Sequence, residues 1–171
     1  MAAKNIRVLD IDLAEKKVEV KERSDLAGYL GGIGLAAKIF SESADPGKDA
    51  LDPVQPVVLA CGPLSTIFPM ATKAVAVFRS PLTGDWGESY AGMRVALAMR
   101  MSGYQAVVIR GKADRPTYLT IGPNGIKFKD ASALWGLPTD ETGRILRQMV
   151  PGRGFRSCLR IGPAGESQVA F

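Results

Sequence analysis

The chain has 171 residues, of which 46% are hydrophobic and 23% charged, as expected for an ordinary soluble globular domain with a real core. Its formal net charge is +5, but lysine and arginine never occur in runs longer than two. The sequence therefore lacks the basic cluster that marks a nucleic-acid-binding protein. It contains no histidine, which excludes Ser-His-Asp and Cys-His hydrolases.

The sequence predicts neither a membrane-spanning helix nor a secretory signal. No apolar run approaches the roughly 18 residues that a membrane-spanning helix needs. Residues 1–7 lack the apolar core of a secretory signal. We therefore expect a cytoplasmic protein without a membrane partner.

The two cysteines, Cys61 and Cys158, have no CxxC neighbour. Ordinary ligand spacing therefore predicts no zinc or iron–sulfur site within this chain. Both cysteines stand in apolar, strand-like runs, and we expect both to be small buried side chains.

The first third of the chain alternates strands and helices. Residues 6–13 and 18–21 alternate with period two and predict an opening β-hairpin. Ser24 or Asp25 can cap a short helix over 26–30, the glycines of 31–34 interrupt it, and 35–40 continue as helix. The proline- and glycine-rich residues 45–56 predict a loop.

The middle of the chain is organised around residues 79–104. Strands are predicted at 57–61 and 74–78, followed by a tight turn at 80–84 and a polar segment at 85–92 without clear period. A helix over 93–101 ends before Gly103. Because a glycine-containing loop leads into this helix, its unpaired N–H groups would suit an anion such as a phosphate.

The last third predicts a strand at 106–110, a hairpin of 117–121 with 126–128, and a helix over 141–149. Further strands are predicted at 157–161 and from 169 onward. Since the sequence stops in an apolar strand start, we expect a fragment of a longer protein. Residues 31–37 and 91–97, 60 positions apart, both lead small residues into an apolar helix, which suggests two copies of one strand, loop and helix unit.

Four segments in order carry a family resemblance: GGIGLAA (31–37), SPLTG (80–84), MSGYQAVVIRGKADRPTYL (101–119) and RIGPAGE (160–166). With the entry hairpin VLDIDLAEKKVEV, they resemble the N-terminal domain of the aldehyde ferredoxin oxidoreductase family. The resemblance implies an α+β fold of two pseudo-repeated β-sheet units with short helices. It covers 1–171 as a single domain, the base on which a metallopterin sits.

Members of that family oxidise aldehydes to carboxylic acids with a tungsten- or molybdenum-bis-pterin bridged by magnesium. They pass electrons through a [4Fe–4S] cluster to ferredoxin. The resemblance implies that the cluster and the substrate pocket come from later domains, so this chain alone should not turn over substrate. It also implies ferredoxin, other domains of the same chain or a homo-oligomer as partners.

The resemblance places the cofactor-binding residues at Lys73, Tyr90, Ala91 and Gly92. The family's Asn-Ser-Gly-Gly segment, which faces the pterin phosphates and magnesium, corresponds here to Tyr90 through Met93, and only Gly92 matches. A Gly-Arg pair becomes Thr72-Lys73, which keeps the positive charge but not the bidentate fork of arginine. Ile33 likewise replaces an arginine of the first repeat.

These departures leave two hypotheses. The first is a divergent cofactor-binding domain of an aldehyde ferredoxin oxidoreductase-like enzyme. The second is a non-catalytic docking or phosphate-ligand-binding module that has lost pterin binding.

Overall fold

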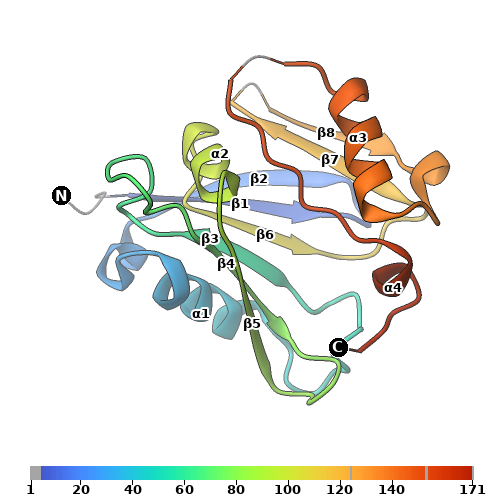
Figure 1. The fold of residues 1–171 in the computed structure, drawn as a ribbon. Coiled ribbons are helices and arrows are strands. Elements are labelled where there is room, and N and C mark those ends of the chain that lie inside the picture. Colours follow the sequence, from blue (N-terminus) through green and yellow to red (C-terminus); the bar gives the residue numbers. More distant parts are fainter. Residues whose placement is uncertain (1–4, 124, 153, 171) are drawn as a thin grey trace.

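A computed structural model describes residues 5–123, 125–152 and 154–170 of the chain (Figure 1). The strands are β1 (Ile6–Asp12), β2 (Lys17–Arg23), β3 (Val57–Cys61), β4 (Ala74–Arg79), β5 (Trp86–Ala91), β6 (Ala106–Arg110), β7 (Thr117–Gly122) and β8 (Gly125–Asp130). The α-helices are α1 (Gly32–Ser43), α2 (Val95–Met101), α3 (Thr139–Met149) and α4 (Pro163–Glu166). Two short 3-10 helices are η1 (Ser24–Tyr29) and η2 (Ser132–Leu134).

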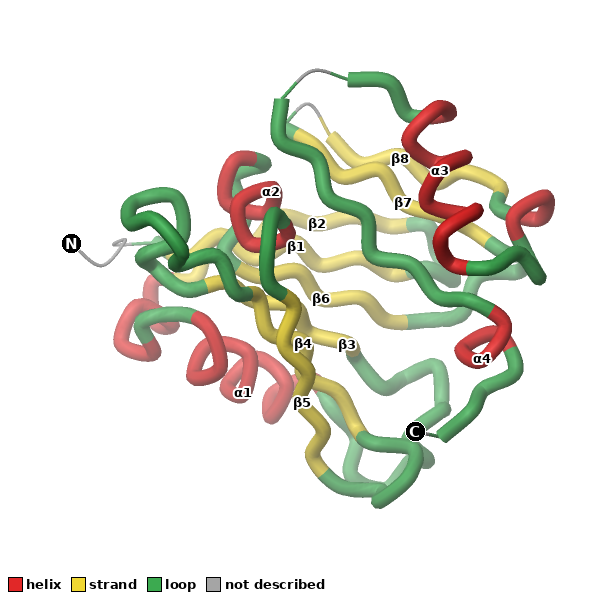
Figure 2. Tube along the Cα trace, in the orientation of Figure 1, coloured by secondary structure: helices red, strands yellow, loops and turns green. Residues whose placement is uncertain are grey.

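Six strands form one sheet in the order β2-β1-β6-β3-β4-β5, and β7 pairs with β8 in a separate sheet. Strands β1 and β6 are parallel, while the other neighbours in the large sheet are antiparallel. The predicted α+β class with short helices is confirmed. The two glycine-containing helix entries lead to α1 and α2, which pack on opposite faces of the large sheet (Figure 2).

The first face of the large sheet is closed by α1. Alternate residues of the strands point to this face and bury their side chains against the helix, because successive side chains of a strand point to opposite sides. The helix contributes three apolar side chains, Leu35, Ala36 and Ile39. The core on this face consists of Ile6, Val8, Leu26, Leu35, Ala36, Ile39, Val58, Ala60, Val75, Val77, Ala106 and Val108.

The second face is closed over part of its width. Leu9, Ile11 and Val107 lie beneath the apolar side of the β7–β8 hairpin. Helix α2 covers the ends of β3 and β4, where Ala96 packs against Cys61. This burial confirms the predicted hairpin, and the buried Cys61 confirms the prediction for that cysteine.

The predicted interruption between two helical segments is present but shorter than expected. It consists of Leu30 and Gly31, between η1 and α1, whereas Gly32 and Gly34 already belong to α1. Gly31 has φ +139°, and a Cβ atom there would lie 2.9 Å from the Cys61 carbonyl oxygen. A glycine is therefore required where the start of α1 approaches the end of β3.

Residues 85–92 contain a strand that the sequence pattern missed. Strand β5 pairs along its whole length with β4, from Ala74 opposite Ala91 to Arg79 opposite Trp86. It forms the edge of the large sheet, so its side chains need not alternate between core and solvent. The predicted helix start at Met93 was also wrong, since Met93 has φ +60° and α2 begins at Val95.

The predicted strand at 157–161 is absent from the structure. This segment is an exposed coil, and Cys158 is exposed rather than buried, against expectation. After this segment, residues 163–166 form the short helix α4. Residues 169 and 170 form no strand, and Phe171 lies outside the described residues. In the part of the chain that the structure describes, no helix is both long and apolar enough to cross a membrane.

Candidate functional site

The register of β4 and β5 brings together three of the four predicted site residues. Ala74 pairs with Ala91, so Lys73 and Gly92 are the next residues outward at the same end of the hairpin. These two positions are 19 residues apart in sequence, and the antiparallel pairing makes them neighbours. Lys73, Ala91 and Gly92 therefore lie together at the end of the β4–β5 hairpin that adjoins the start of α2. Figure 1 shows this end of the hairpin, which we call the site edge.

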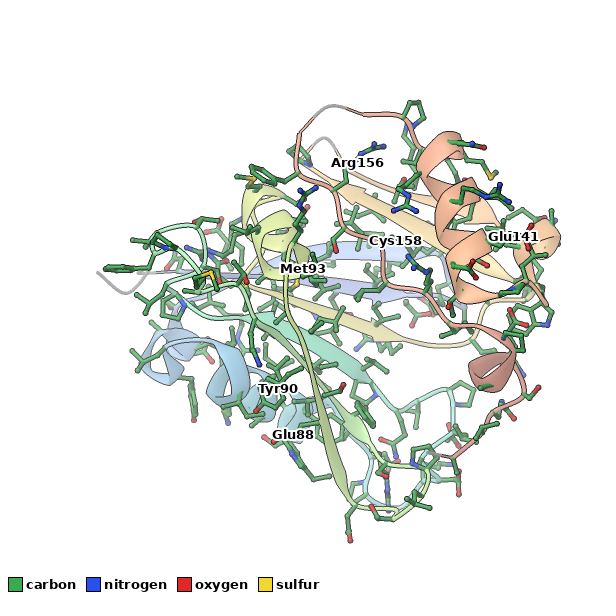
Figure 3. The ribbon with its side chains drawn as sticks, in the orientation of Figure 1. Glu88, Tyr90, Met93, Glu141, Arg156 and Cys158 are labelled. Atoms are coloured by element: carbon green, nitrogen blue, oxygen red, sulfur yellow. The ribbon has the colours of Figure 1, made fainter. Side chains whose placement is uncertain are left out.

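Tyr90 belongs to the other face of the sheet. Its cross-strand partner is Val75, which is part of the core under α1. Figure 3 shows Tyr90 and Glu88 along β5. Partial burial, then the charge of Glu88 and a hydrogen bond with it, raise the pKa of the Tyr90 hydroxyl. Because adjacent strand residues point to opposite faces, the side chains of Tyr90 and Ala91 cannot contact the same small ligand.

The connection from β5 to α2 exposes backbone donors. Among the described residues, the N–H groups of Gly92, Met93 and Arg94 have no hydrogen-bond acceptor. A Cβ atom at Gly92 would meet nothing within 4 Å, so the space in front of it is open. Met93 is held in the left-handed region and its side chain is 82% exposed (Figure 3). Free donors in succession can bind an anion.

Beside this connection, the second face of the sheet carries an apolar pocket of about 160 Å³. The small side chains of Ala74, Ala76 and Ala91 form its floor, so a flat group can approach the backbone closely. We call it the alanine-floored pocket. Leu159 also lines the pocket. It belongs to the segment of residues 155–161, which crosses in front of the sheet in Figure 1. The pocket is lined by Leu59, Ala74, Val75, Ala76, Ser89, Ala91, Val95 and Leu159.

A second cationic side chain belongs to the same connection. Arg94 directly precedes α2, and its guanidinium carbon lies 5.8 Å from the ring centre of Phe155. Together with Lys73, it gives the edge a positive character. Arginine and lysine remain charged at neutral pH, so they favour an anionic ligand.

The groups around this connection are hydrogen-bond donors and cations. Burial raises the pKa of the Cys61 thiol to about 11, against a smaller opposing effect of Arg100, so the thiol stays protonated at neutral pH. Within residues 5–123, 125–152 and 154–170, no three His, Cys, Asp or Glu side chains are grouped to hold a metal ion. A phosphate-bearing ligand would therefore be held by backbone N–H groups and cationic side chains.

Sequence reasoning missed Met93 and Arg94 as parts of the site. Their free N–H groups follow from the backbone path between β5 and α2, and the missed strand hid that path. The sequence does contain a signal, which is Gly92 shortly before a helix. It led only to the general prediction of an anion-binding loop, without donor groups assigned to Met93 and Arg94.

Comparison with known proteins identifies the family of the chain. The family model described as "Aldehyde ferredoxin oxidoreductase, N-terminal domain" matches residues 8–171. The tungsten-containing aldehyde ferredoxin oxidoreductase of Pyrococcus furiosus is 33% identical over 168 residues, which is 96% of this chain and 28% of that protein. The protein of the same name from Pyrococcus horikoshii is 30% identical with the same coverage.

A second P. furiosus relative has a different name. The "Aliphatic sulfonate oxidoreductase, WOR-like subunit" is 31% identical, and the match covers all of this chain and 30% of the subunit. Among solved structures, the BamBC active-site complex of benzoyl coenzyme A reductase, in complex with 1,5-dienoyl-CoA, superposes with a TM-score of 0.79 at 27% identity. That match covers 84% of this chain and 22% of the other.

The chain thus spans less than a third of the length of these curated relatives. The family match covers nearly the whole chain. The chain belongs to the aldehyde ferredoxin oxidoreductase family and is an N-terminal domain of that family of tungsten oxidoreductases.

Proposed function

We propose that the edge formed by Lys73, Ala91 and Gly92 holds the phosphate end of a tungsten- or molybdenum-pterin cofactor, with the alanine-floored pocket beside it. The observation that carries the proposal is the row of free N–H groups at Gly92, Met93 and Arg94, open to solvent and next to a lysine. The names of the tungsten-containing relatives support this choice of cofactor.

The residues present fit a phosphate-bearing group better than a bare metal ion. Charge-assisted hydrogen bonds to a phosphate need donors, which the backbone and Lys73 supply. The side chain of Tyr90 takes no part, because it points to the α1 face; at this position only its backbone lies along the site edge. The divergence from the family at Tyr90 is therefore compatible with binding through main-chain groups.

In the proposed full-length protein, the bound metallopterin supplies two-electron oxidation chemistry. An aldehyde and one water become a carboxylic acid, two protons and two electrons, and two oxidised ferredoxins each accept one electron. The [4Fe–4S] cluster, the bridging magnesium, a second pterin, the cytoplasmic location and a homo-oligomer belong to this proposal. In this proposal, the present chain contributes the positioning of the cofactor.

The experiment measures binding of molybdopterin, released anaerobically from another pterin enzyme, to the chain by equilibrium dialysis. Lys73→Ala should weaken binding about tenfold, the loss expected for one hydrogen bond to a charged group. Gly92→Val should weaken it at least as much, because its side chain fills the open space. Lys112→Ala, at an exposed lysine of another loop, is the matched control.

Binding that is unchanged in both Lys73→Ala and Gly92→Val would place the cofactor elsewhere. A folded wild-type chain that binds no molybdopterin, while inorganic phosphate still binds in a Lys73-dependent way, would favour the phosphate-ligand module. A chain that binds neither would leave the docking module as the better description.

A further inference from the structure

The segment of residues 155–161 runs uncoiled across the second face of the sheet, between α2 and α3 (Figure 2). Its first residue, Phe155, lies against Arg94 just before α2. Near its end, the Arg160 guanidinium lies against Gly143 of α3. The segment is therefore stretched between two helices and is not folded back on itself.

The backbone of this segment has no partner strand. No backbone–backbone hydrogen bond involves residues 155–161 within the part of the chain that the structure describes. Every residue from Phe155 to Ile161 is exposed. Its amide and carbonyl groups thus present an open row, which is the feature by which an unpaired strand recruits another.

The side chains of the segment alternate in chemistry. Phe155, Leu159 and Ile161 are apolar and more than half exposed, and Leu159 faces the alanine-floored pocket. Arg156 and Arg160 occupy the alternate positions on either side of Cys158. Figure 3 shows Arg156 and Cys158. This is the pattern of a strand with one apolar and one charged side, which is why the sequence predicts a strand here.

Both ends of the segment are fixed. At the start, Arg156 is tied to the Val150 carbonyl. Beyond the end, Gly162 is buried against Thr139, and the Glu166 carboxylate accepts a hydrogen bond of 2.8 Å from the Gly136 N–H. A segment held at both ends loses less conformational freedom when it pairs, so pairing costs less.

We propose that residues 155–161 become a β-strand by pairing with an extended segment of an adjoining polypeptide. The residues of that partner segment alternate between apolar and acidic. Main-chain hydrogen bonds would supply the affinity, as in other cases of strand addition. The acidic residues of the partner would face Arg156 and Arg160, and its apolar residues would extend the row of Phe155, Leu159 and Ile161.

The charges argue against a second copy of this chain as the partner. Two copies paired antiparallel about Cys158 would place Arg156 of each opposite Arg160 of the other, and like charges directly opposite are destabilising. The relatives provide a source for another partner. The chain spans 28% of the tungsten-containing relatives, so domains of this family lie next to a large further length of polypeptide.

The experiment follows hydrogen exchange of the 156–161 backbone amides in the chain, with two synthetic peptides as probes. One is an acetylated, amidated Val-Glu-Val-Glu-Val-Glu-Val and the other has lysine in place of glutamate, each used below the concentration at which it self-associates. The Glu peptide should slow exchange of these amides tenfold or more, and the Lys peptide should not. The double variant R156E/R160E should reverse this preference, with unchanged exchange in β6 as evidence that it folds.

Three results would overturn the proposal. The amides could already be protected in the chain alone, or could become protected as the chain's own concentration rises, which would indicate a second copy. Saturating Glu peptide could also leave their exchange unchanged. Because the assay contains no pterin, failure here is independent of the proposed cofactor site, and Lys73→Ala should leave the peptide effect intact.

Discussion

The two faces of the large sheet differ in how completely they are closed. On the α1 face, twelve side chains from the strands, η1 and α1 form one buried cluster. On the opposite face, β7–β8 and α2 cover two smaller clusters, and the part over β4 and β5 is an open pocket with alanines on its floor. The closed face can stabilise the domain, while the open face is available for ligand and polypeptide. Mutations can test this division.

The largest effect is expected for Leu35→Ala in α1. Leu35 is fully buried, so removing its methyl groups leaves a cavity and should lower the free energy of unfolding by about 2–5 kcal/mol. Leu159→Ala, on the open face, is the matched control. Its side chain is 54% exposed, and the loss should stay below about 1 kcal/mol. Urea unfolding followed by circular dichroism measures both, and equal losses would contradict the division.

A second pair of variants increases the side-chain volume on each face instead of reducing it. Ala60→Leu forces three extra heavy atoms into the closed face and should cost about 1–3 kcal/mol or more. Ala76→Leu extends into the pocket and should change stability by no more than about 0.5 kcal/mol. Thermal unfolding compares them, and a large loss for Ala76→Leu would mean that the pocket is closed in solution.

Cys61 tests the covered part of the second face through pH. Burial raises the pKa of its thiol from 9.0 to about 11, so the folded state disfavours the thiolate. The resulting stabilisation is complete below pH 9 and is lost as pH rises to about 11. Two pKa units correspond to about 2–3 kcal/mol at most. The stability difference between wild type and Cys61→Ala, measured by urea unfolding from pH 8 to 10.5, should shrink accordingly.

A difference that stays constant over this range would show that solvent reaches Cys61. The exposed Cys158 provides an internal reference for reactivity. In the native chain at pH 8, a thiol reagent should modify Cys158 and leave Cys61 unmodified until the protein is denatured.

The smallest effect is expected on the solvent-exposed side of α1, at Glu42. The Glu42 carboxylate lies 3.1 Å from the Lys38 ammonium and 3.0 Å from the Arg23 guanidinium. Desolvation opposes the charged form, but the hydrogen bonds from these two cations outweigh it and lower the pKa of Glu42. This contribution is therefore present at neutral pH and is lost as pH falls through the folded-state pKa.

Glu42→Gln should lower stability by less than about 1 kcal/mol, and the effect should shrink in high salt. Glu15→Gln, at an exposed loop residue without an ion pair among the described residues, should have no effect. A salt-independent loss in Glu42→Gln would point to packing and not to charge.

Patterns within a few residues predicted much of the fold. The period-two runs at β1 and β2, the apolar runs at β3 and β6, and the hairpin of β7 and β8 all lie where expected. These patterns arise because side chains on one side of each strand must face a core. They can therefore be recognised within the short sequence of the strand itself. The resemblance to the family, confirmed by the family match, predicted the α+β class.

What failed depended on contacts that local sequence does not encode. Strand β5 exists because β4 lies beside it, although its own residues do not alternate. The segment around Leu159 alternates correctly but has no neighbour to pair with among the described residues. For the same reason, the meeting of Lys73 with Gly92, and the separation of Tyr90 from Ala91, required the register of β4 and β5.

The position of β6 sets an order of events in folding. It lies between β1 and β3, so it joins the opening hairpin to the β3–β4–β5 meander. The pairing of Val8 with Ala106 spans nearly a hundred residues, and such long loops must close before their contacts stabilise anything. On a ribosome, the large sheet cannot be completed until residue 110 has emerged. Until then, the apolar edges of β1 and β3 are exposed, which makes the nascent chain a natural client for chaperones.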